Sequence, residues 1–184
     1  MSTQEDFNKE ISNKKRFQFG KNWKEFLKKL NKDRILEAEN SFKDMLRLEE
    51  LDGKSFIDIG SGSGLSSLVA KNLGAKVYSF DFDDSSVWCT QELKSRYYPG
   101  DSNWEISQGS ALDKEFIDSL GTFDVVYSWG VLHHTGEMWI AIENTLNLVS
   151  EDGLLFIAIY NDQGILSRFW WIIKFFYIQL PSFL

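Results

Sequence analysis

Five short strand-like segments alternate with helix-like segments between residues 53 and 160, and this alternation restricts the fold more than any other feature. The expected strands are Ser55–Ile59, Lys76–Asp81, Trp104–Gln108, Phe123–Ser128 and Leu154–Tyr160. Strands separated by helices pair in parallel, with helices on both faces of the sheet. The pattern therefore predicts a doubly wound α/β domain with strand order 3-2-1-4-5. The last strand is so apolar that we expect both its faces to be buried.

The residues before the first strand form a separate helical region. Apolar residues recur at helical spacing in Asn22–Leu30 and Asp33–Leu51, and Asp52-Gly53 is a turn signal. We therefore divide the chain into an N-terminal helical cap, residues 1–52, and a main domain, residues 53–184.

The helix expected at Glu137–Val149 precedes the last strand. Its apolar positions Met138, Ile142, Leu146 and Val149 share one face, which we expect to lie against the sheet.

The composition is that of a globular protein, with 43% hydrophobic and 26% charged residues. The 27 acidic against 20 basic side chains disfavour a nucleic acid partner, which requires a concentrated basic surface. Cys89 is the one cysteine, so an internal disulfide and a thiolate metal site are excluded. No stretch reaches the roughly 18 consecutive apolar residues of a membrane span, and we expect a cytoplasmic protein.

A glycine-rich loop and a carboxylate follow two neighbouring strands. Gly60-Ser61-Gly62-Ser63-Gly64 leaves the first strand and opens a helix, and Asp81 ends the second strand. Glycine lets the backbone turn sharply and approach a ligand closely. A carboxylate at the end of the second strand can accept hydrogen bonds from both hydroxyls of a ribose. Together these features predict a site for an adenosine-type cofactor.

The details of the loop favour a cationic cofactor over a dinucleotide. The dinucleotide pattern places its third glycine one residue later, where this chain has Leu65. Asp58 lies two residues before the first glycine, and its charge would repel a pyrophosphate but attract the sulfonium and ammonium of S-adenosylmethionine. An NAD-dependent oxidoreductase is the alternative within enzymes.

On these motifs, residues 54–160 resemble the class I S-adenosylmethionine-dependent methyltransferases, which have a Rossmann-like fold. Phe56–Gly64 is similar to the first motif of that family, and Phe123–Thr135 to its fourth region. The segments Phe17–Trp23, Tyr127–Thr135 and Ile159–Gly164 resemble a bacterial subgroup that acts on small molecules.

The resemblance implies a set of cofactor-binding residues. They are Asp58, Gly60, Ser61, Gly62, Gly64, Asp81, Phe82, Ser110, Ala111, Ser128 and Trp129. It implies that Asp58 holds the methionine end, Asp81 the ribose, and Phe82 packs near the adenine. Ser110 stands where the family often has an acid that contacts the adenine. The backbone at Ser128 and Trp129 would meet the amino group.

Methyl transfer from a sulfonium is a direct displacement, so a base is needed only when the acceptor must lose a proton. His133 and His134 follow the fourth strand, and adjacent side chains diverge by roughly 100°, so at most one faces the site. The alternative is a packed or capping histidine. Adjacent positions rarely converge on one ion, and acids at Asp83 and Asp84 suit a helix start, so we expect no metal.

The acceptor is expected to be a small molecule that is methylated on oxygen or carbon rather than nitrogen. Enzymes of the family that methylate planar amines usually carry Asn-Pro-Pro-Tyr where this chain has Ser128–Val131. Trp23, Trp129 and Trp139 are either walls for an aromatic or lipid-like acceptor or core residues. The resemblance also makes Phe17, Phe19 and Trp23 candidates for a lid over the substrate.

The C-terminal segment does not supply the final β-hairpin of the family. Residues 164–180 form an expected helix that is apolar nearly all round, which is typical of a buried or lipid-facing helix. Three interpretations stay open: a truncated enzyme, a helix that holds the protein at a membrane surface, or a homodimer face. A cofactor-binding or membrane-associated protein without turnover is accordingly the alternative outside enzymes.

Overall fold

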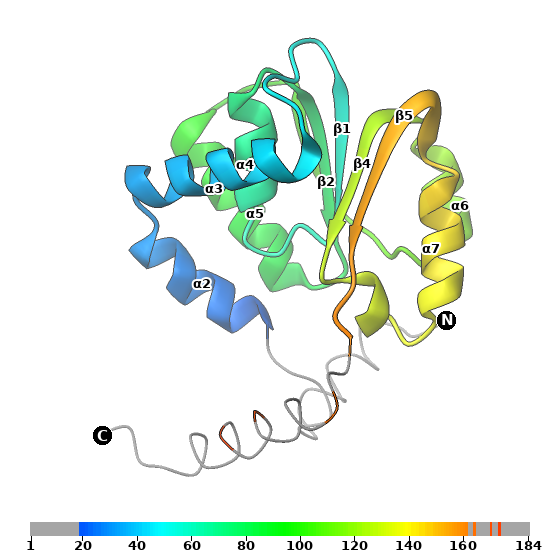
Figure 1. The fold of residues 1–184 in the computed structure, drawn as a ribbon. Helices are drawn as coiled ribbons and strands as arrows, with labels where there is room; N and C mark the ends of the chain where they lie inside the picture. The colour runs from blue at the N-terminus through cyan, green and yellow to red at the C-terminus, as the bar shows by residue number, and fades with distance from the viewer. Residues whose placement is uncertain (1–18, 162–163, 165–169, 171–172, 174–184) are drawn as a thin grey trace.

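The computed structural model describes residues 19–161, 164, 170 and 173, and within them five parallel strands form one sheet in the order β3-β2-β1-β4-β5 (Figure 1). The predicted strand order is confirmed. The strands are β1 (Ser55–Ile59), β2 (Lys76–Asp81), β3 (Trp104–Gln108), β4 (Phe123–Trp129) and β5 (Val149–Ala158).

Helices cover both faces of the sheet, as a doubly wound topology requires (Figure 1). On one face lie α3 (Lys32–Leu46), α4 (Leu65–Asn72) and α5 (Asp84–Tyr97), with α2 (Phe19–Lys29) packed against α5. On the other face lie α6 (Lys114–Ser119), α7 (Met138–Leu146) and the 3-10 turn η1 (Leu132–His134).

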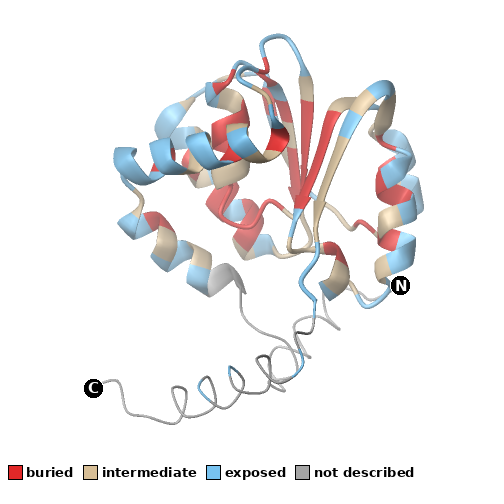
Figure 2. Cartoon of the chain, viewed as in Figure 1, coloured by how far each residue is buried: buried red, intermediate tan, exposed pale blue. Residues whose placement is uncertain are grey.

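Alternation along β1 decides which side chains face which helix layer. Phe56 belongs to the buried cluster under α3, α4 and α5, whereas Ile57 and Ile59 belong to the cluster under α6 and α7. Successive strand side chains point to opposite faces, so Asp58 points with Phe56 toward α4. Figure 2 shows most of β1 and the middle of β4 buried. The side chain of Asp58 is thereby enclosed by the core.

The two N-terminal helices share this core. Leu27 of α2 and Phe42 of α3 are buried in the same cluster as Phe56. Arg96 of α5 donates a hydrogen bond from Nη1 to the Leu27 carbonyl oxygen at 3.2 Å. The helix α3 ends at Leu46, earlier than expected, because Arg47 adopts a left-handed cap conformation with φ 55°.

The last helix and strand differ from the sequence prediction. The helix α7 ends at Leu146, and Val149 already pairs with Phe123, so residues 151–153 lie within β5 instead of forming a turn before it. The pairing is irregular between Phe123 and Val125, and this irregularity absorbs the extra residues.

One prediction about burial at this side of the molecule was wrong, and another was correct only in part. The strand β5 is at the edge of the described sheet, and Leu154 is 37% exposed, so its two faces are not both buried. The buried residues of α7 are Ala141, Asn144 and Thr145. The predicted residues Ile142 and Val149 pack against the core cluster while partly buried, whereas Leu146 is 53% exposed. Small side chains bring α7 close to its neighbours, and the Asn144 amide donates to the Ala111 carbonyl oxygen at 2.9 Å.

The expected C-terminal helix lies outside the described residues, apart from Gly164, Trp170 and Ile173. The membrane-surface and dimer interpretations of that helix therefore stay predictions. Within the part of the chain that the structure describes, no helix combines the length and the apolar character needed to span a membrane.

Candidate functional site

The glycine loop follows β1 and lies at the carboxyl ends of the strands, where doubly wound folds bind their ligands. Gly60, Gly62 and Gly64 have φ values of 74°, 56° and 80°, which side chains other than glycine rarely adopt. A Cβ at Gly60 would lie 2.4 Å from Cγ1 of Val131. The loop after β1 thus touches the loop after β4, and the two meet where the strand order reverses.

The helix α5 holds the far end of this loop. The hydroxyls of Ser61 and Thr90 are hydrogen-bonded at 2.9 Å, and both residues are buried. A Cβ at Gly64 would lie 2.8 Å from the Cα of Thr90, so backbone approaches backbone at this point. The Ser61 side chain therefore fixes the loop from behind, and only its backbone belongs to the open side of the loop.

Replacing Gly64 with alanine is expected to lower the free energy of unfolding by about 2–5 kcal/mol, from the left-handed backbone and from overlap with Thr90. Gly100→Ala is the matched control, because Gly100 has φ 75° and nothing within 4 Å of its would-be Cβ. It should cost about 1 kcal/mol. Urea denaturation measures both, and equal losses would contradict the close packing of the loop on α5.

Asp81 stands at the end of β2 and faces the loop. Its Oδ2 accepts a hydrogen bond from the Gly62 N–H, and its Oδ1 accepts one from the Asp83 N–H, each at 2.9 Å. Removal from water raises the pKa of Asp81 to about 6, although backbone hydrogen bonds from Asp83, Gly62 and Phe82 act in the opposite direction. The carboxylate is where a ribose clasp was predicted, and it also orients the loop.

Asp58 is 2% exposed, and it points toward α4 rather than into open solvent. Its Oδ2 accepts a hydrogen bond from the Ser67 hydroxyl at 2.6 Å. Burial, together with a smaller effect of the nearby Asp81, raises the pKa of Asp58 to about 7, although the Ser67 donors act in the opposite direction. Two desolvated carboxyl groups therefore flank the glycine loop.

The loops after β2 and β3 carry the residues expected near an adenine. The Gln108 side chain donates to the Phe82 carbonyl oxygen at 3.1 Å and ties these loops together. Ser110 accepts a hydrogen bond from the Leu112 N–H at 3.2 Å, so its side chain shapes the local turn. Ala111 is buried and is held by Asn144, a residue to which the sequence analysis assigned no function.

The end of β4 carries the other predicted cofactor residues. Ser128 is fully buried, and its hydroxyl donates to the Ile59 carbonyl oxygen at 3.1 Å, which joins β4 to the start of the glycine loop. Trp129 is 43% exposed, and its ring stacks on Phe156 with the ring centroids 5.9 Å apart. Its exposed surface is open to a further partner.

The two histidines occupy different environments in η1. His134 is exposed, whereas neither Nδ1 nor Nε2 of His133 is accessible, and neither has a hydrogen-bond partner among the described residues. The His133 ring lies 5.1 Å from the ring of Tyr160, which in turn packs over Gly130. A buried polar group without a partner is costly, so the structure distinguishes His133 from His134.

Of the lid candidates, Trp23 lies closest to the site in the described part of the chain. A Cβ at Gly62 would be 3.0 Å from the indole Nε1 of Trp23, which places this α2 side chain directly on the glycine loop. Phe17 and the side chain of Phe19 lie outside the described residues. Trp139 is 75% exposed on α7.

Val131 and Tyr160 also border this region, against Gly60 and Gly130, and neither was predicted from the sequence as a site residue. Both lie within motifs that resembled the family, Tyr127–Thr135 and Ile159–Gly164. Position in those motifs is the one signal that pointed to them.

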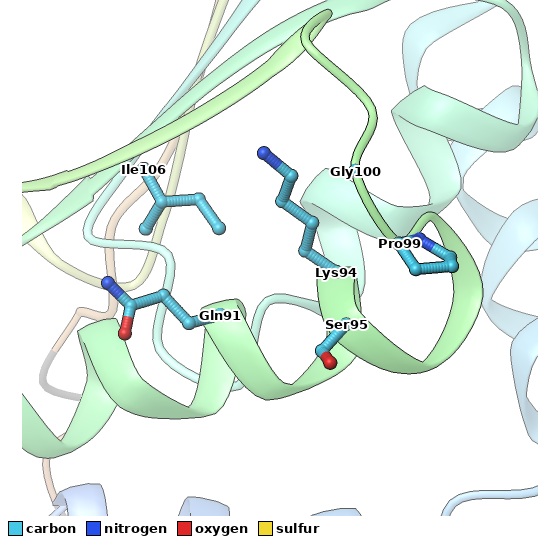
Figure 3. Close-up of a pocket in the computed structure, with 6 residues that line it drawn as sticks. All are labelled: Gln91, Lys94, Ser95, Pro99, Gly100 and Ile106. Carbon is cyan, nitrogen blue, oxygen red and sulfur yellow. The ribbon is translucent and has the colours of Figure 1, made fainter.

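A shallow hollow of about 350 Å³ lies elsewhere, between α5 and β3 (Figure 3). Gln91, Lys94 and Ser95 line it from α5, and Ile106 lines it from β3. The Lys94 ammonium donates to the Trp104 carbonyl oxygen, so its charge is already engaged. None of the predicted site residues borders this hollow.

The acids after β2 build the start of α5. Asp83 is the N-cap and accepts a hydrogen bond from the Ser85 N–H at 3.0 Å. Within the described residues, no group of three or more histidine, cysteine or acidic side chains is arranged to hold a metal ion.

Comparison with known proteins agrees with the glycine loop and the sheet order. A family model described as a methyltransferase domain matches residues 57–155, more than half of the chain. This chain belongs to the methyltransferase domain family. The sequence prediction of a class I methyltransferase is confirmed, and the oxidoreductase alternative is set aside.

Curated relatives of this methyltransferase domain match part of their length. The ubiquinone biosynthesis O-methyltransferase of Glaesserella parasuis is 30% identical over 111 residues, which are 60% of this chain and 47% of the relative. The enzyme of that name from Brucella melitensis is 28% identical over 111 residues, 60% of this chain and 43% of the relative. The chain thus spans less than half of these two relatives.

Solved structures share the fold. Magnesium protoporphyrin IX methyltransferase from Synechocystis, with bound S-adenosylhomocysteine, has a TM-score of 0.59 at 18% identity, covering 81% of this chain and 64% of that one. The [4+2]-cyclase SpnF has a TM-score of 0.57 at 16% identity, covering 70% of this chain and 47% of that one. The fold therefore accommodates more than one chemistry, and the reaction has to be argued from the site.

Proposed function

We propose that this methyltransferase domain binds S-adenosylmethionine and transfers its methyl group to an oxygen atom of a small organic molecule. The single observation that carries the proposal is the pair of desolvated carboxyl groups, Asp58 and Asp81, on either side of a glycine loop. Neither carboxylate is neutralised by an ion pair among the described residues. A cationic ligand would stabilise both, whereas a pyrophosphate would be repelled.

The residues fit the cofactor part by part. Asp81 would accept hydrogen bonds from the ribose hydroxyls, and Phe82 and Ala111 would lie along the adenine. Asp58 and the backbone at Ser128 and Trp129 would hold the amino acid end. S-adenosylmethionine would supply an electrophilic methyl group on a sulfonium.

The acceptor is proposed to be an oxygen nucleophile, from the names of the curated relatives and from His133. Both ring nitrogens of His133 are enclosed in this structure, so the imidazole would have to turn toward a bound acceptor to take the proton of its hydroxyl as the new oxygen–carbon bond forms. The exposed ring face of Trp129 is suited to an aromatic acceptor. The chain's own contribution is to align the acceptor oxygen with the methyl carbon and sulfur and to exclude water.

Calorimetric titration of the full chain with S-adenosylhomocysteine, with NADH as the control ligand, tests cofactor binding. We expect micromolar binding of S-adenosylhomocysteine and none of NADH. Methyl transfer is then measured against a panel of phenols, catechols, aliphatic alcohols, carbon acids and amines. Binding without transfer to any acceptor would favour a protein without turnover, and binding of NADH instead would overturn the proposal.

A further inference from the structure

A chain of buried hydrogen bonds runs from the edge strand β3 across the sheet to Asp58. The Trp104 indole Nε1–H donates to the Ser79 hydroxyl at 3.0 Å, and that hydroxyl donates to the Ser67 hydroxyl at 2.8 Å. The Ser67 hydroxyl donates to the Asp58 carboxylate at 2.6 Å. Trp104, Ser79 and Ser67 are fully buried.

We call this series of hydrogen bonds the relay. The chemistry of its two ends gives it a single direction. An indole N–H can only donate, and an ionised carboxylate can only accept. Each serine has a single hydroxyl proton, so Ser79 must accept from Trp104 and pass its own proton toward Ser67. The same rule makes Ser67 donate to Asp58. Every donor in the series has an acceptor only when Oδ2 of Asp58 accepts the last hydrogen bond.

The register of the sheet explains why these residues meet. Asp58 pairs with Ser79 in the parallel ladder, so both side chains point toward α4, which carries Ser67. Trp104 pairs with Val77, two residues before Ser79, and its long side chain spans that distance. Thr90 and Ser86 are also buried on this side of the sheet, but Thr90 bonds to Ser61 and to the Ser86 carbonyl oxygen, whereas the hydrogen bonds of Trp104, Ser79 and Ser67 lead to Asp58.

We propose that Trp104, Ser79 and Ser67 are positioning residues that hold the Asp58 carboxylate in the orientation required by the amino group of the cofactor. This inference rests on the proposed function. Connected buried hydrogen bonds polarise one another, so each donor strengthens the next. The relay leaves Asp58 rigid and favours its ionised form before the cofactor arrives.

The groups that surround Asp58 determine how its pKa changes when a hydrogen bond of the relay is lost. Asp81 faces it from the end of β2, and Tyr127 is its ladder partner on β4. From α4, the hydroxyl and the backbone N–H of Ser67 both lower the pKa of Asp58. Loss of a donor in the relay should therefore move the titration of Asp58 to higher pH.

The test is carboxyl-carbon NMR of the free full chain, with the Asp58 signal assigned by Asp58→Asn. Ser67→Ala should raise the midpoint by about one to two pH units, since a hydrogen bond to a charged group is that strong. Trp104→Phe and Ser79→Ala should raise it by a smaller amount, about half a unit. Thr145→Val is the control, because it deletes a fully buried hydroxyl on α7.

The outcomes separate the relay from the function. Midpoints unchanged in the three relay variants, or an equal shift in Thr145→Val, would overturn the relay. Its positioning role predicts that the ratio of the Kd of Ser67→Ala to the Kd of wild type for S-adenosylhomocysteine is largest near pH 7 and falls as the pH rises toward 9. Equal weakening at every pH would contradict that role. Shifted midpoints in a wild-type chain that binds no S-adenosylhomocysteine would overturn the proposed function and leave the effect of the relay on Asp58 established.

Discussion

Asp81→Asn is expected to weaken the binding of S-adenosylhomocysteine by about 10- to 100-fold, which is about 1.4–2.7 kcal/mol. The asparagine keeps the shape of the side chain but loses the charge and one accepting oxygen. It can no longer accept from both ribose hydroxyls as a carboxylate does. Isothermal titration at pH 8, above the pKa of about 6, measures the loss with the wild-type carboxylate ionised.

Asp81 also accepts a hydrogen bond from the Gly62 N–H, so displacement of the glycine loop alone would also weaken ligand binding in Asp81→Asn. A 2′-deoxy analogue of S-adenosylhomocysteine separates the two causes. If Asp81 clasps the ribose, the analogue binds wild type less tightly but binds Asp81→Asn with no additional loss. Asp84→Asn, which neutralises an exposed acid three residues away, should bind normally. If the losses of affinity from the mutation and from the missing hydroxyl add up, Asp81 orients the loop and does not bind the ribose.

His133→Leu is expected to lower the rate of methyl transfer by about 10²- to 10⁴-fold while raising the free energy of unfolding by about 1 kcal/mol. The opposite signs follow from the geometry. Both ring nitrogens are buried without a partner in the described structure, so an apolar side chain suits the folded state better. Leucine, in contrast, cannot accept a proton, so the variant lacks the base.

Rates are measured on the acceptor found in the panel, and stability is measured by urea denaturation. His134→Leu is the matched control, since His134 is the exposed neighbour in the same turn, and it should change the rate less than threefold. A stabilised His133→Leu that retains full activity would identify His133 as a packed residue. Binding of S-adenosylhomocysteine should be unchanged in both variants.

The pH dependence of stability has a definite sign at this site. Asp58 and Asp81 have pKa values raised to about 7 and about 6, above their ordinary value of 3.8. The unfolded chain loses these protons first, so the folded state binds more protons between about pH 4 and pH 7. These groups therefore lower stability as the pH rises through that interval. A cationic ligand should oppose this loss.

The sequence alone determined the strand order and the placement of the glycine loop next to the acid that ends β2. Both depend on local patterns: apolar segments alternating with helices, glycines directly after β1, and an acid at the end of β2. These patterns survive folding because φ values and strand spacing are properties of a few neighbouring residues. The local pattern failed at residues 149–153, where pairing with β4 extends β5 through a sequence typical of a turn.

The tertiary structure decided which polar side chains act together. No spacing in the sequence joins Trp104, Ser79 and Ser67 to Asp58, or Thr90 to Ser61, because these partners come from different elements. Likewise, adjacent histidines are equivalent in the sequence, and only the direction of the η1 turn encloses the ring nitrogens of His133 and exposes His134. Backbone preferences are local, whereas the desolvation and hydrogen bonding that give Asp58 its properties arise only when distant segments pack around it.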